Sequence, residues 1–204
     1  MGTRIGIFGG SFDPIHFGHL LLAELCCESF QLDQIRFLVA NVSPFKTDQQ
    51  PASDKDRIEM VMLAIGGNPK FEIDTREIDR GGVSYTIDSV RSISAELPGS
   101  KLFLLMGSDA LADIAKWREP SELFRLVTPS VISRGGVGDP PWNVLEPYID
   151  PIRMMEILKS KVTAPQIEIS SRDLRERCRR GKSIRYQVPS AVEMFIRERG
   201  LYRE

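Results

Sequence analysis

The stretch Ile-Gly-Ile-Phe-Gly-Gly-Ser-Phe-Asp-Pro-Ile-His-Phe-Gly-His-Leu-Leu-Leu, residues 5–22, contains the features that decide the fold. Its first four residues form an apolar run that is typical of a buried parallel strand. Gly9 and Gly10 end the run and let the backbone turn tightly or approach a ligand. Pro14 precedes an apolar-rich segment that predicts a helix. A strand, a glycine turn and a helix start together predict an anion site, because unpaired N–H groups point outward there.

The only two histidines of the chain, His16 and His19, lie in this stretch, three residues apart. At that spacing both side chains can face the same side of a helix start. Two imidazoles beside a helix N-terminus indicate a centre that handles phosphates. A purely structural role would be the usual reading of two arbitrary histidines, but the glycine context and the spacing argue against it here.

Strands and helices alternate along the rest of the chain. Extended segments are predicted at 34–40, 71–78, 101–106, 127–133 and 166–169, and helices at 20–30, 53–65, 85–97, 109–117, 120–126, 152–161, 170–181 and 189–200. This alternation predicts one α/β domain over residues 1–204, Rossmann-like and doubly wound, with a mostly parallel sheet and helices on both faces. Residues 166–204 are expected to form a C-terminal helical part. The Gly/Pro-rich segment 134–151 is expected to be mobile or variable.

Composition excludes several classes of protein. The chain has 204 residues, 42% hydrophobic and 27% charged, which is ordinary for a globular domain. A net charge of −1 gives no global electrostatic case for nucleic-acid or membrane binding, so any anion site must be local. Cys26, Cys27 and Cys178 suggest neither a disulfide framework nor a CxxC metal pair. With no signal-peptide pattern and no long apolar run, a cytoplasmic protein is expected.

Several familiar motifs fail on spacing. Gly6, Gly9 and Gly10 do not match the dinucleotide fingerprint GxGxxG, and Gly181-Lys182-Ser183 lacks the upstream glycine of a P-loop. Neither HExxH nor GxSxG occurs. Two histidines without a suitable third ligand nearby also argue against a zinc site.

The segment from Gly9 to His19 resembles the HxGH signature of the nucleotidylyltransferase superfamily. Its full length is similar to the opening of the bacterial nicotinate-nucleotide adenylyltransferases, which join ATP and nicotinate mononucleotide into nicotinate adenine dinucleotide. Four later stretches follow the family's order, and so does the ending Gly200-Leu201-Tyr202. They are Pro44-Phe45-Lys46 for PxHK, Ser84-Tyr85-Thr86 for SYT, Gly107-Ser108-Asp109 with Trp117 for GxD…W, and residues 169–175 for ISSTxIR.

The resemblance implies a role for each matching residue, with His16, His19 and Arg175 as the catalytic groups. ATP binding is implied for Gly9, Gly10, Ser11, Phe12, His16, Gly18, His19, Lys46, Gly107, Asp109, Ser170, Ser171 and Arg175. Binding of nicotinate mononucleotide is implied for Ser11, Lys46, Tyr85, Thr86, Trp117 and Arg134. In the family the Thr86 amide holds the nicotinate carboxylate and Trp117 stacks on the ring. No protein metal ligand is expected, because Mg²⁺ should be held mainly by the phosphates of ATP and by water.

Three residues depart from the family pattern: Phe45 replaces a histidine, Arg172 a threonine and Arg118 a common aromatic residue.

Two alternative functions stay open at this point. One is another HxGH transferase, such as a pantetheine-phosphate adenylyltransferase, and the other is a nucleotide-binding sensor without turnover. The preference for nicotinate over nicotinamide mononucleotide and the oligomeric state, a homo-oligomer included, also stay open.

Overall fold

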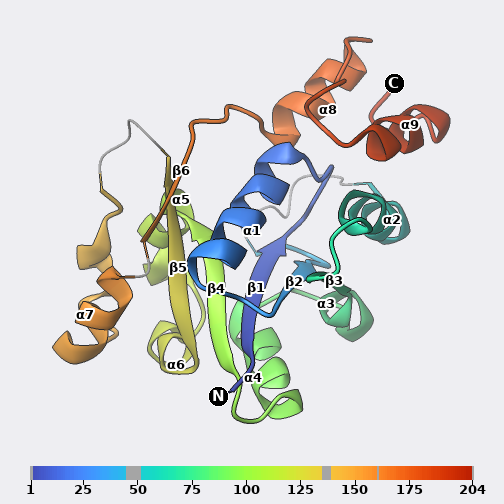
Figure 1. Cartoon of the computed structure of the whole chain (residues 1–204). Coiled ribbons are helices and arrows are strands. Elements are labelled where there is room, and N and C mark those ends of the chain that lie inside the picture. The colour runs from blue at the N-terminus through green and yellow to red at the C-terminus, as the bar shows by residue number, and fades with distance from the viewer. Residues whose placement is uncertain (1, 45–51, 135–138, 160, 204) are drawn as a thin grey trace.

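The fold is a parallel sheet with helices on both faces (Figure 1). The computed structural model describes residues 2–44, 52–134, 139–159 and 161–203. Within these ranges six strands pair in the order β3-β2-β1-β4-β5-β6, and each neighbouring pair is parallel. The strands are β1 (Arg4–Gly10), β2 (Gln34–Val39), β3 (Phe71–Asp74), β4 (Lys101–Gly107), β5 (Val127–Arg134) and β6 (Lys161–Ala164).

The helices pack on the two faces of the sheet, and each of the larger helices buries one apolar side against it. One apolar core cluster takes residues from α1, α2, α8 and α9, and the other takes residues from α4, α5, α6 and α7. This is the doubly wound arrangement predicted from the sequence. The bounds are α1 (Phe17–Ser29), α2 (Asp54–Ile65), α3 (Arg76–Arg80), α4 (Thr86–Glu96), α5 (Ser108–Ala112), α6 (Pro120–Leu126), α7 (Pro151–Leu158), α8 (Ser171–Arg179) and α9 (Ser190–Glu198), with 3-10 turns η1 (Ile114–Lys116) and η2 (Trp142–Leu145).

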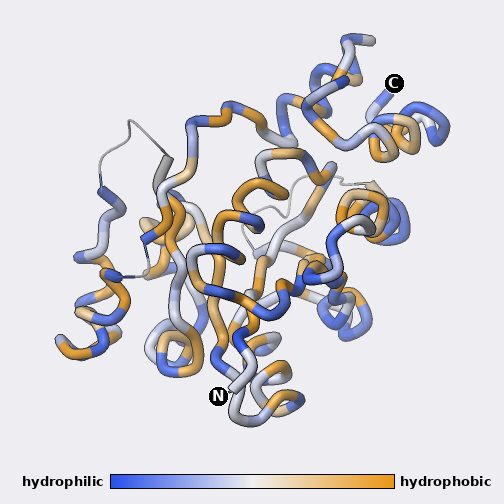
Figure 2. The backbone as a smooth tube through the Cα atoms, in the orientation of Figure 1, coloured by the Kyte–Doolittle hydropathy of each residue, from blue (hydrophilic) through white to orange (hydrophobic). Residues whose placement is uncertain are grey.

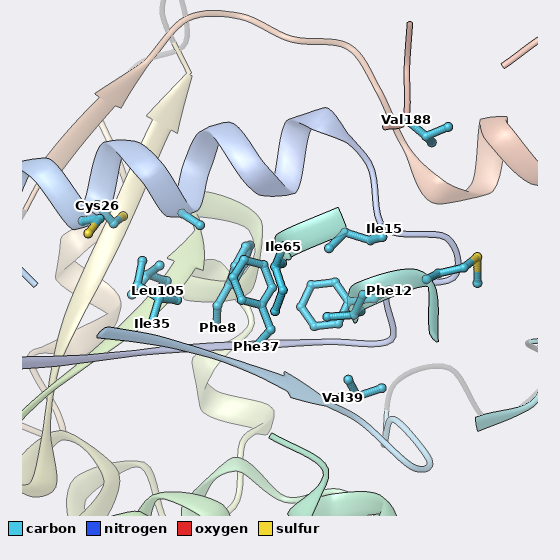
Figure 3. Close-up of a cluster of buried hydrophobic side chains, with 14 of the residues drawn as sticks. Phe8, Phe12, Ile15, Cys26, Ile35, Phe37, Val39, Ile65, Leu105 and Val188 are labelled. Carbon is cyan, nitrogen blue, oxygen red and sulfur yellow. The ribbon is translucent and has the colours of Figure 1, made fainter. Parts of the chain in front are cut away.

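Strand β4 shows how one apolar run serves both faces. Leu102, Leu104 and Met106 join the cluster beneath α4 to α7, whereas Phe103 and Leu105 join the cluster beneath α1. Successive side chains of a strand point to opposite faces, so a strand buried on both sides must be apolar throughout. Figure 2 shows apolar positions along the central strands, and Figure 3 shows the cluster between α1 and the sheet.

Two predicted extended segments differ from the structure. Residues 71–78 were expected to be extended throughout, but β3 ends at Asp74 and α3 begins at Arg76, because the Asp74 carboxylate accepts the Arg76 backbone N–H at 3.1 Å. The last strand is β6, at residues 161–164, whereas residues 166–169 pair with no strand. Helix α7 accordingly ends at Leu158, before the predicted 161.

The sheet order places a topological switch point between β1 and β4. The chain adds β2 and β3 on one side of β1, and β4, β5 and β6 on the other. Where the strand order reverses in this way, a crevice opens at the carboxyl ends of the strands. Helices α8 and α9 lie at this end of the molecule, beside the start of α1 (Figure 1). No helix in the described part of the chain is long and apolar enough to cross a membrane.

A buried arginine holds the edge of this crevice in place. Arg57 of α2 is 1% exposed, and its Nη1 donates to the carbonyls of Ser11 at 2.9 Å and Ala40 at 2.6 Å. Its Nη2 donates to the Asp54 carboxylate at 2.5 Å. These two carbonyls follow the ends of β1 and β2, so one side chain satisfies the backbone where both strands stop.

Replacing Arg57 by methionine should lower the free energy of unfolding by about 2–4 kcal/mol, because buried acceptors and the Asp54 charge lose their donor. Urea unfolding followed by circular dichroism measures the change. The matched control is Arg125→Met, since Arg125 is exposed and pairs with Glu122 within α6, where about 0–1 kcal/mol is expected. Equal losses in the two variants would contradict the role of Arg57.

Candidate active site

A cavity of about 330 Å³ lies at the switch point, in the size range of small-molecule sites. The ends of β1, β2 and β4 contribute Gly9, Gly10, Ala40 and Gly107 to its lining. The cavity therefore collects segments that are far apart in sequence. Of the predicted site residues, its lining contains Gly9, Gly10, Ser11, Tyr85, Thr86, Gly107 and Trp117.

The two histidines stack on each other at the start of α1. Their ring centroids are 3.7 Å apart with the planes at 24°, as their spacing predicted. The Nδ1 atom of His19 accepts the backbone N–H of His16 at 3.3 Å. In the neutral ring the proton then lies on Nε2, which leaves that nitrogen as a hydrogen-bond donor. Phe8 and Phe12 pack edge-on against His19 and fix its orientation.

His16 is buried, at 6% exposure, and burial lowers its pKa from 6.5 to about 4. The His19 N–H donates to the His16 carbonyl at 2.9 Å, and the His16 Nδ1 atom has no hydrogen-bond partner within the described part of the chain. A Cβ on Gly18 would lie 2.9 Å from that Nδ1. Glycine at position 18 is thus required by the ring of His16, and the imidazole is neutral at physiological pH.

The second predicted phosphate site joins the opening loop from the other end of the chain. Ser171 Oγ donates to the Pro14 carbonyl at 2.9 Å, and Arg175 Nη1 donates to the Asp13 carbonyl at 2.7 Å. Ser170 is the N-cap of α8 and accepts the Asp173 N–H at 3.1 Å. The structure therefore brings Ser171 and Arg175 beside the loop that carries the histidines.

The Asp13 carboxyl group holds these segments together. It is buried at 4% exposure, and its Oδ1 accepts the Tyr202 hydroxyl at 2.5 Å and the Ala52 N–H at 3.1 Å. Arg175 lies 3.6 Å from Oδ2. Burial, followed by the Asp13 charge, raises the pKa of Tyr202, so this hydroxyl remains a donor. The buried charge thus joins the first loop, the start of α2, α8 and the C-terminus.

A buried carboxylate in the cavity lining supports the Ser84-Tyr85-Thr86 turn. Glu77 lines the cavity, and its Oε1 accepts the Ser89 hydroxyl at 2.6 Å. Burial raises the pKa of Glu77, while hydrogen bonds from Ser89 and Ser84 oppose that rise. Ser84 Oγ also accepts the Asn41 N–H at 2.9 Å, which connects the turn to the end of β2.

Several predicted residues lie outside the cavity lining, including the three predicted catalytic residues His16, His19 and Arg175, together with Gly18, Ser170 and Ser171. Phe12 is 2% exposed and its side chain belongs to the core, so the predicted contact with ATP would have to come from its backbone. Asp109 is exposed in the first turn of α5. Arg134 ends β5, and its side chain lies outside the described atoms, as do the whole of Phe45 and Lys46. Thr86, by contrast, does line the cavity; it is the first residue of α4, and the N-cap is Tyr85.

Sequence reasoning missed three residues that the fold makes important: Asp13, Arg57 and Glu77. Each is a charged side chain buried among segments distant in sequence. The sequence offered one usable signal, since Asp74-Thr75 ahead of Glu77 is a helix-starting combination that would have placed Glu77 on α3.

The low pKa of His16 has a measurable consequence. In the folded protein its ring protons should titrate near pH 4 in NMR spectra, and a His16→Gln variant identifies the signal. Between pH 6.5 and about 4 the unfolded chain binds a proton at His16 that the folded chain does not. Acidification through this range should therefore lower the free energy of unfolding, by about 3 kcal/mol in total, and less in His16→Gln. Titration of His16 near 6.5 would contradict its burial.

Comparisons with known proteins agree with this architecture. The family described as Cytidylyltransferase-like matches residues 7–177. A Rhodopirellula baltica protein named "Probable nicotinate-nucleotide adenylyltransferase" is 39% identical over 199 residues, covering 98% of this chain and 93% of its own length. A Thermus thermophilus protein of the same name is 38% identical over 200 residues, covering 98% and 100%.

Solved structures give the same fold at lower identity. Plasmodium falciparum nicotinic acid mononucleotide adenylyltransferase complexed with NaAD superimposes with a TM-score of 0.70 at 19% identity, covering 98% of this chain and 97% of that one. The same enzyme complexed with APC gives 0.71 at 18% identity with equal coverage. The family match over most of the chain and the near-full-length relatives establish that this chain belongs to the cytidylyltransferase-like family and, within it, to the nicotinate-nucleotide adenylyltransferases.

Proposed function

We propose that the protein transfers the adenylyl group of ATP to nicotinate mononucleotide, giving nicotinate adenine dinucleotide and pyrophosphate in NAD biosynthesis. The observation that carries the proposal is the stacked pair His16 and His19 at the start of α1, the helix that follows the cavity-lining residues Gly9, Gly10 and Ser11. Two relatives that match 98% of this chain are named as probable nicotinate-nucleotide adenylyltransferases.

The chemistry requires alignment more than proton transfer. A phosphate oxygen of nicotinate mononucleotide attacks the α-phosphorus of ATP, and the bond from that phosphorus to the pyrophosphate oxygen breaks. A phosphate monoester has a second pKa near ~6, so the nucleophile is mainly a dianion at neutral pH and needs no general base. What remains for the protein is to bring two anions into line and to stabilise the charge that moves onto pyrophosphate.

The histidines supply hydrogen-bond donors to the ATP phosphates. His16 is neutral because burial lowers its pKa to about 4, and the tautomer of His19 places a proton on Nε2. Donors fixed by packing stabilise developing charge without a cost of reorganisation. The first N–H groups of α1 add to the same anion site, and Gly9 and Gly10 let the backbone approach.

Other side chains complete the two substrate subsites in this proposal. Ser171 and Arg175, with Ser170 as the cap of α8, hold the β- and γ-phosphates, and Lys46 adds a charge from its loop. Tyr85, Thr86, Trp117 and Arg134 bind nicotinate mononucleotide, and Ser11 lies between the two substrates. Gly107 and Asp109 contact the adenosine side. ATP enters as its Mg²⁺ complex, because phosphate oxygens and water are the ligands that Mg²⁺ prefers.

One assay separates this function from its alternatives. The purified protein is incubated with ATP, Mg²⁺ and nicotinate mononucleotide, and pyrophosphate release is followed; rapid release is expected. Release with phosphopantetheine alone would identify a pantetheine-phosphate adenylyltransferase. Tight ATP binding by calorimetry without turnover of either acceptor would identify a nucleotide sensor.

The His19→Ala variant should lose about 10²–10³-fold in kcat, because one preorganised donor to the transferring phosphate is removed. Pyrophosphate release is the measurement, and unfolding curves show whether the variant stays folded. His19→Asn is the matched variant, since its amide keeps a donor and should recover part of the rate. An alanine variant as active as the parent would exclude the phosphate contact.

A further inference from the structure

An arginine at the family's aromatic position lines the acceptor side of the cavity. Arg118 directly follows Trp117, and both contribute to the lining together with Tyr85 and Thr86. The guanidinium carbon lies 4.8 Å from the centroid of the Tyr85 ring. Such stacking holds the planar guanidinium in one orientation while leaving its edge N–H groups available.

The positive charge of Arg118 is incompletely matched by its neighbours. Its Nη1 is 3.7 Å from Asp88 Oδ2 and its Nε is 3.7 Å from Glu119 Oε1, both longer than a charge-assisted hydrogen bond. Glu119 already accepts two hydrogen bonds from Arg91, at 3.2 and 2.6 Å. A guanidinium has five N–H donors, so Arg118 retains the capacity to bind an anionic group.

The other charges around this side of the cavity also favour an anion. The N-terminus of α4, an 11-residue helix, begins at Thr86 on the same wall. Lys116 lines the cavity as well, and its Nζ donates to the Asp113 carboxylate at 2.7 Å. Among the described lining residues Glu77 is the only carboxylate, and it is buried and accepts the Ser89 hydroxyl. Within the described lining the two cations Lys116 and Arg118 thus stand against one carboxylate, while their ion-pair partners Asp113, Asp88 and Glu119 lie outside the lining.

We infer that Arg118 is a specificity-determining residue whose guanidinium pairs with the ring carboxylate of the acceptor and selects nicotinate over nicotinamide mononucleotide. The inference rests on the proposed function and names the chemical group that this wall recognises. The two acceptors differ only in a charged carboxylate against a neutral carboxamide. The carboxamide can accept one hydrogen bond from Arg118 but gains no ion pair, so the residue discriminates by charge.

The test compares kcat/KM for nicotinate and nicotinamide mononucleotides in the parent, Arg118→Gln and Arg118→Lys. Glutamine keeps an amide donor but removes the charge, so the preference for nicotinate should fall about tenfold. Lysine keeps the charge and should recover most of the preference. The KM for ATP should stay unchanged in both variants.

Arg125→Gln is the matched control, because Arg125 is an exposed arginine that pairs with Glu122 outside the cavity lining, so its removal should leave the preference intact. An equal loss on both acceptors in Arg118→Gln would overturn the inference, since Arg118 would then bind a part that they share. An unchanged ratio would also overturn it. A parent protein inactive on both acceptors would instead refute the proposed function itself, and calorimetry with ATP would show whether the protein is folded and binding.

Discussion

The buried Asp13 carboxyl group is the constraint on which the site depends. A charge removed from water is costly unless charged or hydrogen-bonding partners surround it. Here the partners are the Tyr202 hydroxyl, the Ala52 N–H and Arg175, which come from the C-terminus, the start of α2 and α8. The cost of burying Asp13 is offset only when all of these segments are in place. The geometry of the loop that carries the two histidines therefore depends on segments from both ends of the chain.

The other polar groups of the site act through their local electrostatic fields, because the net charge of the chain is only −1. Burial keeps His16 uncharged, the hydrogen bond to His19 Nδ1 selects its tautomer, and two helix N-termini lie beside the same loop. In the cavity lining the Arg118 guanidinium lies beside Tyr85, at the start of α4. Donors and dipoles fixed by packing bind phosphates and carboxylates without an overall positive charge.

The accuracy of the sequence predictions followed the strength of each local signal. The extended segment 101–106, the helix over 53–65 and the placement of both histidines on one side of a helix start were confirmed, because each depends on neighbours in the chain. The short segments 161–164 and 166–169 carry similar alternating patterns, and only pairing with β5 decides between them. The roles of Lys46 and Arg134 stay predictions, since their side chains lie outside the described atoms.

The sequence by itself determined the doubly wound class, the position of the loop that carries the two histidines and the family, because periodicity and the motif of residues 9–19 are local properties of the chain. The tertiary structure alone decided which charges are buried together. Asp13, Arg57 and Glu77 are ordinary polar residues in the sequence, and each acquires its role only by meeting groups from distant segments. Their partners are separated by up to 189 positions in the chain, beyond the reach of any local pattern.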